Sequence, residues 1–155
     1  MISVEVIGDL MDSYGQLSER LLSVADAQKW QPAPNEWSFQ FIAGHMATVE
    51  HDCWLARIQD VIAGKFPTFT SYDNSNHDFS NLSLEQWVDV WGDWRQALFT
   101  FIYQVPPEML VFTGTHEMYG SMDVPAILDH IKLHDEAHLA HLETMIAEYQ
   151  QQANG

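Results

Sequence analysis

Apolar residues recur every three or four positions along four long stretches of the chain, which is the spacing of one face of an α-helix. The stretches cover residues 4–24, 38–63, 83–103 and 123–150. Gly64 directly follows the second stretch and is a suitable C-terminal stop for a helix. Four such segments, without a strong strand pattern, predict an all-α protein folded as a four-helix bundle.

Sequence signals mark two of the expected helix starts. Ser83, followed three residues later by Gln86, has the form of a capping box, in which each side chain bonds the other residue's backbone amide. Asp123 is a candidate N-cap residue, and Pro125 lies close inside the helix that follows. We therefore expect the third and fourth helices to begin at these positions.

Long connections separate the expected helices. Residues 65–82 are rich in Asn, Asp and Ser and are expected to form a long loop, of the kind that is often functional or disordered. Residues 107–123 include Gly114 and Gly120 and are expected to hold a short extended segment. The length of the chain fits one domain, which we take to be residues 1–155.

Two histidines of the fourth helix fall inside its apolar stripe. If each residue advances by about 100° and His130 is set at zero, the apolar residues lie at about 60° to 120°. His134 and His138 lie at about 40° and 80°, whereas His141 lies near 20°, at the margin of the stripe. Because His134 and His138 are four residues apart, their imidazoles can bind one ion from one helix.

The second helix supplies a third inward-facing histidine. With His45 at zero, the apolar residues around it lie at about 20° to 100°, so His45 is on the core-facing side. His51 lies near 240°, well away from the core. His77 and His116 lie in loop regions, where the pattern gives no orientation. The spacing therefore selects His45, His134 and His138.

Three neutral imidazoles suit a divalent metal such as Zn, Ni or Fe, and three protein ligands leave positions open for water or substrate. Open positions are typical of catalytic rather than structural sites. The alternative is that the three residues are ordinary core histidines, each hydrogen-bonded to a neighbour. Asp52 lies near His45 on the helical wheel and Asp135 less favourably, and either could hold an imidazole N–H. The pattern assigns no catalytic residue.

Competing motifs explain the sequence less well. His134 to His138 differs from the zinc-protease pattern His-Glu-x-x-His by an Asp at the Glu position, and Asp is too short to reach a metal-bound water well. The helicase-like string from Asp135 to His138 lacks any partner phosphate-binding loop. No pair of Glu-x-x-His segments of the ferritin-like type occurs. Cys53, on the core face near His45, is expected to be a small buried residue, with a metal-ligand or thiol role as the alternative.

Composition narrows the functional classes. The formal net charge is −16, with 22 acidic against 6 basic residues, so nucleic acid and anionic membrane surfaces are disfavoured as partners. A single Cys excludes an internal disulfide framework. No signal-peptide pattern or long apolar run is evident, so we expect a cytoplasmic protein.

Several short motifs resemble those of the DinB-like family of metal-binding four-helix bundles, over nearly the whole chain. They are Asn35-Glu36-Trp37-Ser38 leading into Phe41-Ile42-Ala43-Gly44-His45, then Gly120 before Val124-Pro125-Ala126-Ile127-Leu128, and finally His134-Asp135-Glu136-Ala137-His138-Leu139. The family places one histidine on the second helix and a His-x-x-x-His pair on the fourth, which match the same three residues.

The resemblance implies activities as well as a fold. Characterised members are thiol transferases that use bacillithiol or mycothiol with a Zn-type ion, and others are regarded as metal-dependent hydrolases. A related bundle forms one domain of an iron-dependent sulfoxide synthase, and because these 155 residues fit a single domain we do not expect that chemistry here. We therefore expect a metal-dependent transferase or hydrolase, acting on a small molecule with a low-molecular-weight thiol as a potential co-substrate and forming a homodimer. The alternative is a bundle that binds a metal or small ligand without turnover.

Overall fold

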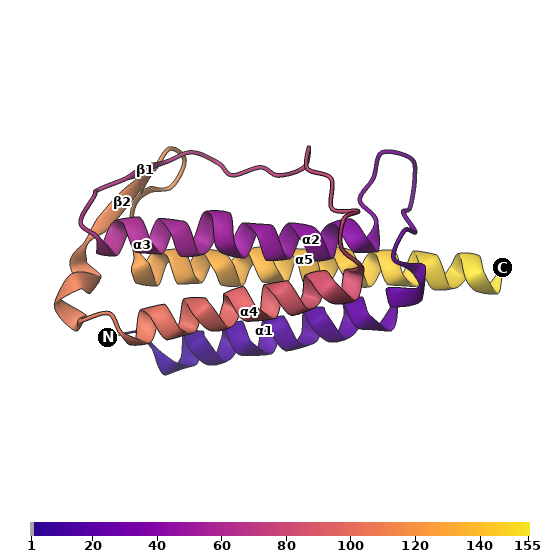
Figure 1. The fold of residues 1–155 in the computed structure, drawn as a ribbon, viewed down its shortest axis with the longest axis horizontal. Coiled ribbons are helices and arrows are strands. Elements are labelled where there is room, and N and C mark those ends of the chain that lie inside the picture. The colour runs from indigo at the N-terminus through magenta and orange to yellow at the C-terminus, as the bar shows by residue number, and fades with distance from the viewer. Residues whose placement is uncertain (1) are drawn as a thin grey trace.

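The computed structural model of the protein describes residues 2–155 and shows four long helical segments lying side by side (Figure 1). Three are single α-helices: α1 (Val4–Ser23), α4 (Leu84–Tyr103) and α5 (Val124–Asn154). The other runs without a break through α2 (Phe39–Val49), a π-helical turn (Glu50–Leu55) and α3 (Ala56–Ile62). Short 3₁₀ turns occupy Ala25–Ala27 and Pro107–Val111. The predicted four-helix bundle is confirmed.

The helix ends follow the capping signals. The Ser83 hydroxyl accepts a hydrogen bond from the Gln86 backbone N–H, and the Gln86 side chain accepts one from the Ser83 N–H, so the capping box is present. The Asp123 carboxylate caps α5 by accepting from the backbone N–H of Ala126. Gly64 has a φ of 72°, a left-handed conformation that favours glycine directly after a helix.

The π-helical turn is a departure that the hydrophobic pattern did not predict. A π turn holds more residues than an α turn, so every later residue of the segment is rotated relative to an uninterrupted α-helix. Ile58 and Val61 are fully buried as a result. Ala56, which the uninterrupted wheel places on the core face, is only partly buried.

A small sheet closes one end of the bundle. Its strands are β1 (Thr68–Phe69), β2 (Thr113–His116) and β3 (Gly120–Asp123). β1 pairs with β2 in parallel and β2 pairs with β3 antiparallel, so the sheet ties together the two long connections. The extended segment expected within 107–123 is confirmed, whereas its pairing with a strand from 65–82 was not predicted.

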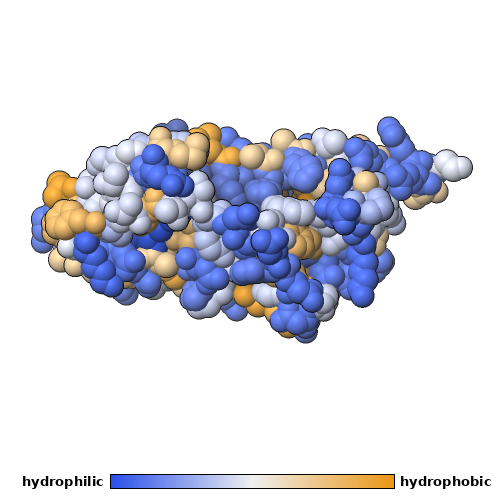
Figure 2. All heavy atoms as spheres, turned by 90° about the horizontal axis from the view of Figure 1, so that it is seen from above, coloured by the Kyte–Doolittle hydropathy of each residue, from blue (hydrophilic) through white to orange (hydrophobic). Residues whose placement is uncertain are grey.

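The core consists of two apolar clusters along the bundle. One, nearer the sheet, includes Leu55, Ile58, Leu98 and Ile127; the other, nearer the opposite end, includes Leu17, Phe39, Trp91 and Leu142. No helix within residues 2–155 has both the length and the apolar character needed to cross a membrane. Figure 2 shows hydrophilic residues over most of one face, with hydrophobic residues in small separate patches.

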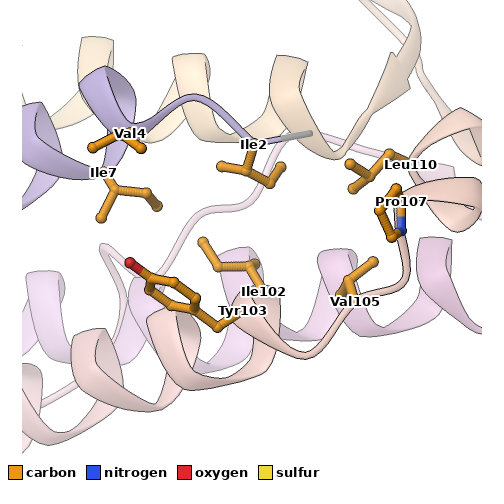
Figure 3. A pocket seen from close by; sticks show the side chains of 8 residues that line it. All are labelled: Ile2, Val4, Ile7, Ile102, Tyr103, Val105, Pro107 and Leu110. Carbon is orange, nitrogen blue, oxygen red and sulfur yellow. The ribbon is translucent and has the colours of Figure 1, made fainter.

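A cavity of about 330 Å³ opens near the sheet end, between the start of α1 and the end of α4 (Figure 3). Its lining is apolar and comprises Ile2, Val4, Ile7, Ile102, Tyr103, Val105, Pro107 and Leu110. Because the lining has no histidine, carboxylate or thiol, the candidate chemistry lies elsewhere in the bundle.

Candidate metal centre

Three histidine side chains from two helices meet between α2 and α5. The Nε2 atom of His45 lies 3.2 Å from Nε2 of His134 and 3.1 Å from Nε2 of His138. The ligand atoms of the three residues all lie within 4.8 Å of one another, and across residues 2–155 no other group of His, Cys, Asp or Glu has this arrangement. The structure therefore brings together the three histidines that the sequence selects.

His45 is oriented by a residue from the long loop between α3 and α4. Its Nδ1 lies 2.5 Å from the Oδ1 of Asn74, and the Asn74 amide donates to the His45 backbone carbonyl at 3.5 Å. Because the amide nitrogen faces that carbonyl, Oδ1 faces the ring, and Nδ1 must carry the proton. The Nε2 atom of His45 is then left with a free lone pair, pointing at the other two rings.

The loop that carries Asn74 is anchored by close packing on α2, and Figure 1 shows it running over that helix. Phe79 is buried directly over Gly44, where a Cβ atom would approach the Phe79 ring to 2.4 Å. The Phe79 carbonyl also accepts a hydrogen bond from the Trp87 indole at 2.8 Å. The residue before His45 must therefore be glycine for the loop to lie close enough to supply Asn74.

Two tryptophans border the three-histidine cluster. The Trp37 ring lies 4.7 Å from that of His45 and stacks on that of His138 at 5.8 Å, with 12° between the ring planes. The Trp54 ring meets His134 edge to face at 5.5 Å. The Nδ1 atom of His134 is buried and has no hydrogen-bond partner within residues 2–155. Its nearest charged neighbour is the Oδ1 of Asp135, at 4.0 Å.

Burial keeps two of the three rings neutral. Burial is the main reason that the pKa of His45 is lowered to about 4 and that of His138 to about 3. The neighbouring His134 acts in the same direction on both, whereas the hydrogen bond to Asn74 partly opposes burial at His45. At pH 7 these two imidazoles are therefore uncharged, and their lone pairs remain available to a ligand.

This donor set fits a divalent metal ion. The lone pair of His45 Nε2 can accept a good hydrogen bond from only one of its two neighbours, so the rings cannot satisfy one another fully. Metal–nitrogen bonds of about 2.0–2.1 Å at tetrahedral angles place the nitrogen atoms about 3.3–3.4 Å apart, close to the separations observed. Neutral imidazoles are ligands for Zn, Ni and Fe.

A pocket of about 430 Å³ leads from the surface to the three-histidine cluster. It is lined by Pro32, Asn35, Glu36, Trp37, His138 and His141. His141 is exposed, consistent with its place at the margin of the helical stripe, and contributes to the pocket wall rather than to the cluster. The pocket gives a small molecule access to one of the three rings.

Comparison with known proteins identifies the family of this chain and a solved structure with a similar fold. The family model of the DinB superfamily matches residues 12–142. The chain belongs to the DinB superfamily. None of the curated proteins matches it. Among solved structures, it is similar to YfiT from Bacillus subtilis, described as a probable metal-dependent hydrolase with an unusual four-helix bundle topology. That match has a TM-score of 0.77 at 14% identity and covers 99% of this chain and 91% of YfiT.

The carboxylate near His45 on the helical wheel lies away from the site in this DinB-superfamily bundle. Asp52 is exposed, contacts the His51 ring at 2.7 Å and accepts a hydrogen bond from the Tyr72 hydroxyl at 3.4 Å. The prediction that it could hold the His45 imidazole is wrong, because the π-helical turn rotates Asp52 outward. Asn74 takes that place, and a loop residue of this kind leaves no periodic signal in the sequence.

Asp135, the less favoured candidate, is completely buried and belongs to an ion-pair cluster that the sequence analysis missed. Arg95 of α4 contacts Glu50 through both carboxylate oxygens at 2.8 Å and Asp135 at 2.8 and 3.3 Å. We call Arg95, Glu50, Asp135, Ser13 and Trp91 the Arg95 cluster. Its sequence signal is a charged residue four positions after Trp91, within the apolar stripe of α4.

Charges within the Arg95 cluster compensate for burial. Burial alone would raise the pKa of Asp135, but the Arg95 guanidinium, together with the side chains of His134 and Ser13, holds that pKa below its usual value. Burial alone would likewise lower the pKa of Arg95, but Glu50 and Asp135 raise it instead. The guanidinium is therefore permanently charged within the bundle.

The other candidate residues lie outside the three-histidine cluster. Cys53 is buried in the apolar core, as expected, and burial raises the pKa of its thiol to about 11. His51 and His77 are exposed. His116 is buried on β2, where its Nδ1 accepts the backbone N–H of Met118. Within residues 2–155, none of them belongs to the three-histidine cluster.

Proposed function

We propose that this protein is a metal-dependent enzyme of the thiol-transferase or hydrolase type. His45, His134 and His138 bind one divalent cation (Zn, Ni or Fe), and the site activates a thiol or a water molecule for attack on a small substrate. The observation that carries this proposal is the convergence of three Nε2 atoms beside a pocket whose wall includes His138, one of the three residues.

Bound to the three imidazoles, a divalent ion would supply Lewis acidity, which lowers the pKa of a small nucleophile such as water or a thiol. The chain's own residues do the rest. Asn74 keeps the proton on Nδ1 of His45 and so keeps its Nε2 lone pair free. Trp37 covers the rings of His45 and His138 on one side and limits access of water there. The pocket beside it, which Glu36 and His141 help to line, accepts the substrate.

Two further observations support an enzyme rather than a structural metal site. Three protein ligands leave positions free, whereas structural zinc sites are closed by four. The pocket also reaches His138, so a substrate could approach the open side of the site. YfiT, which shares the fold, is described as a probable metal-dependent hydrolase, and this agrees with the proposal.

The first test is metal binding by protein purified without a histidine tag. After chelation and reloading, we expect about one equivalent of Zn or Ni per chain and a rise in melting temperature, because binding to the native state stabilises it. His138→Ala should abolish both. The matched control is His141→Ala, on the same helix and at the pocket but outside the cluster, which should still bind. Less than about 0.2 equivalents in the wild type would overturn the proposal.

The second test is turnover. The loaded wild type is screened with electrophiles in the presence of low-molecular-weight thiols, and with ester and amide substrates in water. We expect turnover that requires both the metal and His138. Stoichiometric metal binding without turnover of any of these substrates would instead indicate a bundle that only binds a ligand.

A further inference from the structure

We infer that Asp135 is the hydrogen-bond acceptor of the metal ligand His134 and that Arg95 is the positioning residue that presents it. This inference rests on the proposed metal site. It assigns a function to the buried Arg95 cluster, whose members do not themselves reach the three Nε2 atoms.

The guanidinium of Arg95 is fully occupied. It makes five hydrogen bonds: two to Glu50, two to Asp135 and one to the carbonyl of Leu10 at 3.0 Å. A guanidinium has five N–H donors in a rigid plane, so this geometry leaves none free. The five contacts fix α4 to α1, to the π-helical turn and to α5, and Arg95 cannot turn toward another partner without losing some of them.

The two oxygens of Asp135 are unequally occupied. Oδ2 accepts from the Ser13 hydroxyl at 2.6 Å and from Arg95 at 2.8 Å. Oδ1 has only the longer contact to Arg95, at 3.3 Å. The Oδ1 atom is also the one that lies 4.0 Å from Nδ1 of His134, which is itself buried without a partner. The least satisfied acceptor of the Arg95 cluster therefore faces the unsatisfied ring nitrogen of the three-histidine cluster.

A cation at Nε2 would complete this arrangement. Once the Nε2 lone pair of His134 is used for a metal, the ring proton lies on Nδ1, which then needs an acceptor, and metal-bound histidines usually donate to a carboxylate or carbonyl. Asp135 is the carboxylate nearest to that atom, and its ties to Arg95 and Ser13 keep it from moving into the metal site as a ligand.

The charges of the Arg95 cluster act in the same direction. All contacts to Glu50 and Asp135 come from donors, namely Arg95, Trp91 and Ser13, as expected for two ionised carboxylates. Two negative charges against one guanidinium leave one excess negative charge buried beside the histidines. An excess of this sign stabilises a cation bound nearby.

The experiment compares metal affinities of folded variants by competition with a chelator, using Zn²⁺ and Co²⁺ as probes. Asp135→Asn should weaken affinity by about 10- to 100-fold, the usual effect of losing such a partner. Glu50→Gln removes the same charge from the Arg95 cluster but from a residue that does not face His134, so its effect should be at least about fivefold smaller. Leu98→Ala, a core truncation on α4, controls for loss of stability and should leave affinity unchanged.

A measurement on the wild type keeps the inference testable if Asp135→Asn does not fold. In the ¹H–¹⁵N NMR spectrum, zinc loading should produce a protected, strongly downfield Nδ1 proton that correlations within the imidazole ring assign to His134. Equal losses in Asp135→Asn and Glu50→Gln, or the absence of that proton, would overturn the role of Asp135 while leaving the metal site intact. A wild type that binds no metal would instead refute the proposed function, and this inference with it.

Discussion

The three-histidine cluster and the Arg95 cluster adjoin each other in the bundle, yet they differ in how far their polar atoms are satisfied. Asp135 of one directly follows His134 of the other along α5. The Arg95 cluster is charged and buried, and all five guanidinium donors are used. In the three-histidine cluster, His45 Nε2 can accept from only one of its two neighbouring rings, and Nδ1 of His134 has no hydrogen-bond partner within residues 2–155.

The difference separates a structural role from a binding role. A buried charged network stabilises a fold only when every member is satisfied, and it then has no capacity left for a ligand. Neutral imidazoles whose nitrogen atoms lack full hydrogen bonding destabilise the ligand-free protein. Binding of a ligand to those nitrogen atoms removes this cost. We therefore expect loss of Arg95 to act mainly on folding, and loss of a ring of the three-histidine cluster to act mainly on metal binding. Asp135, whose Oδ1 is the least satisfied acceptor of the Arg95 cluster, links the two.

The largest expected effect is on folding. Arg95→Met leaves two buried carboxylates without their cation, which should lower the free energy of unfolding by about 3–5 kcal/mol. Arg20→Met is the matched control, because Arg20 pairs with Glu143 at 3.9 Å on the surface and such pairs contribute at most about 1 kcal/mol. Urea denaturation of the metal-free proteins measures both. Similar losses for the two variants would show that the Arg95 cluster does not hold the bundle together.

The next effect separates binding from folding. The wild type should gain about 2.7 kcal/mol of stability at a free zinc concentration of 100 times Kd. His138→Ala should lose this gain, while its metal-free stability should change by only about 1 kcal/mol, because its ring is partly buried and its hydrogen bond is to His45, within the cluster. Denaturation with and without zinc measures both values. A large loss of metal-free stability would mean that the histidines are structural.

A smaller effect is expected at the loop. Asn74→Ala removes the group that fixes the His45 tautomer, so metal affinity should fall by about tenfold. Asn76→Ala, an exposed change two residues along the same loop, serves as the control and should have no effect. Chelator competition compares the two. Unchanged affinity in Asn74→Ala would show that the helices alone orient His45.

The smallest effect is expected at Asp52. The side chain is exposed and paired with His51 and Tyr72, so Asp52→Asn should change metal affinity by less than about twofold, as is usual for surface substitutions away from a site. The same titration measures it. A tenfold loss would restore Asp52 as the partner of His45 that the uninterrupted helix pattern indicates.

The sequence pattern predicted most where the backbone is regular. α5 is one uninterrupted helix, and the wheel placed His134 and His138 inward and His141 at the margin, as observed. On the second helix the same reasoning placed His45 correctly, because His45 precedes the π-helical turn. It failed for Asp52, which lies within that turn.

The roles of Asn74 and Arg95 could not be predicted from the sequence, for two different reasons. Asn74 reaches the site because the long loop packs against α2, where the absence of a side chain on Gly44 leaves room for Phe79. The path of such a loop leaves no periodic pattern in the sequence. Arg95 did carry a signal, since a charge inside an apolar stripe must find a partner when buried. Its partners could not be deduced, because they belong to other helices and their pairing depends on how the helices pack.

The π-helical turn between His45 and the end of α3 also bears on how relatives should be aligned. Such a turn holds one residue more than the α-helical turn it replaces, so a relative with a regular helix would be one residue shorter at this point. Alignment methods tend to confine gaps to loops, and here that preference would shift every position of α3 by one. A single-residue gap within Glu50–Leu55 would keep both halves of the helix, and the core faces they present, in register.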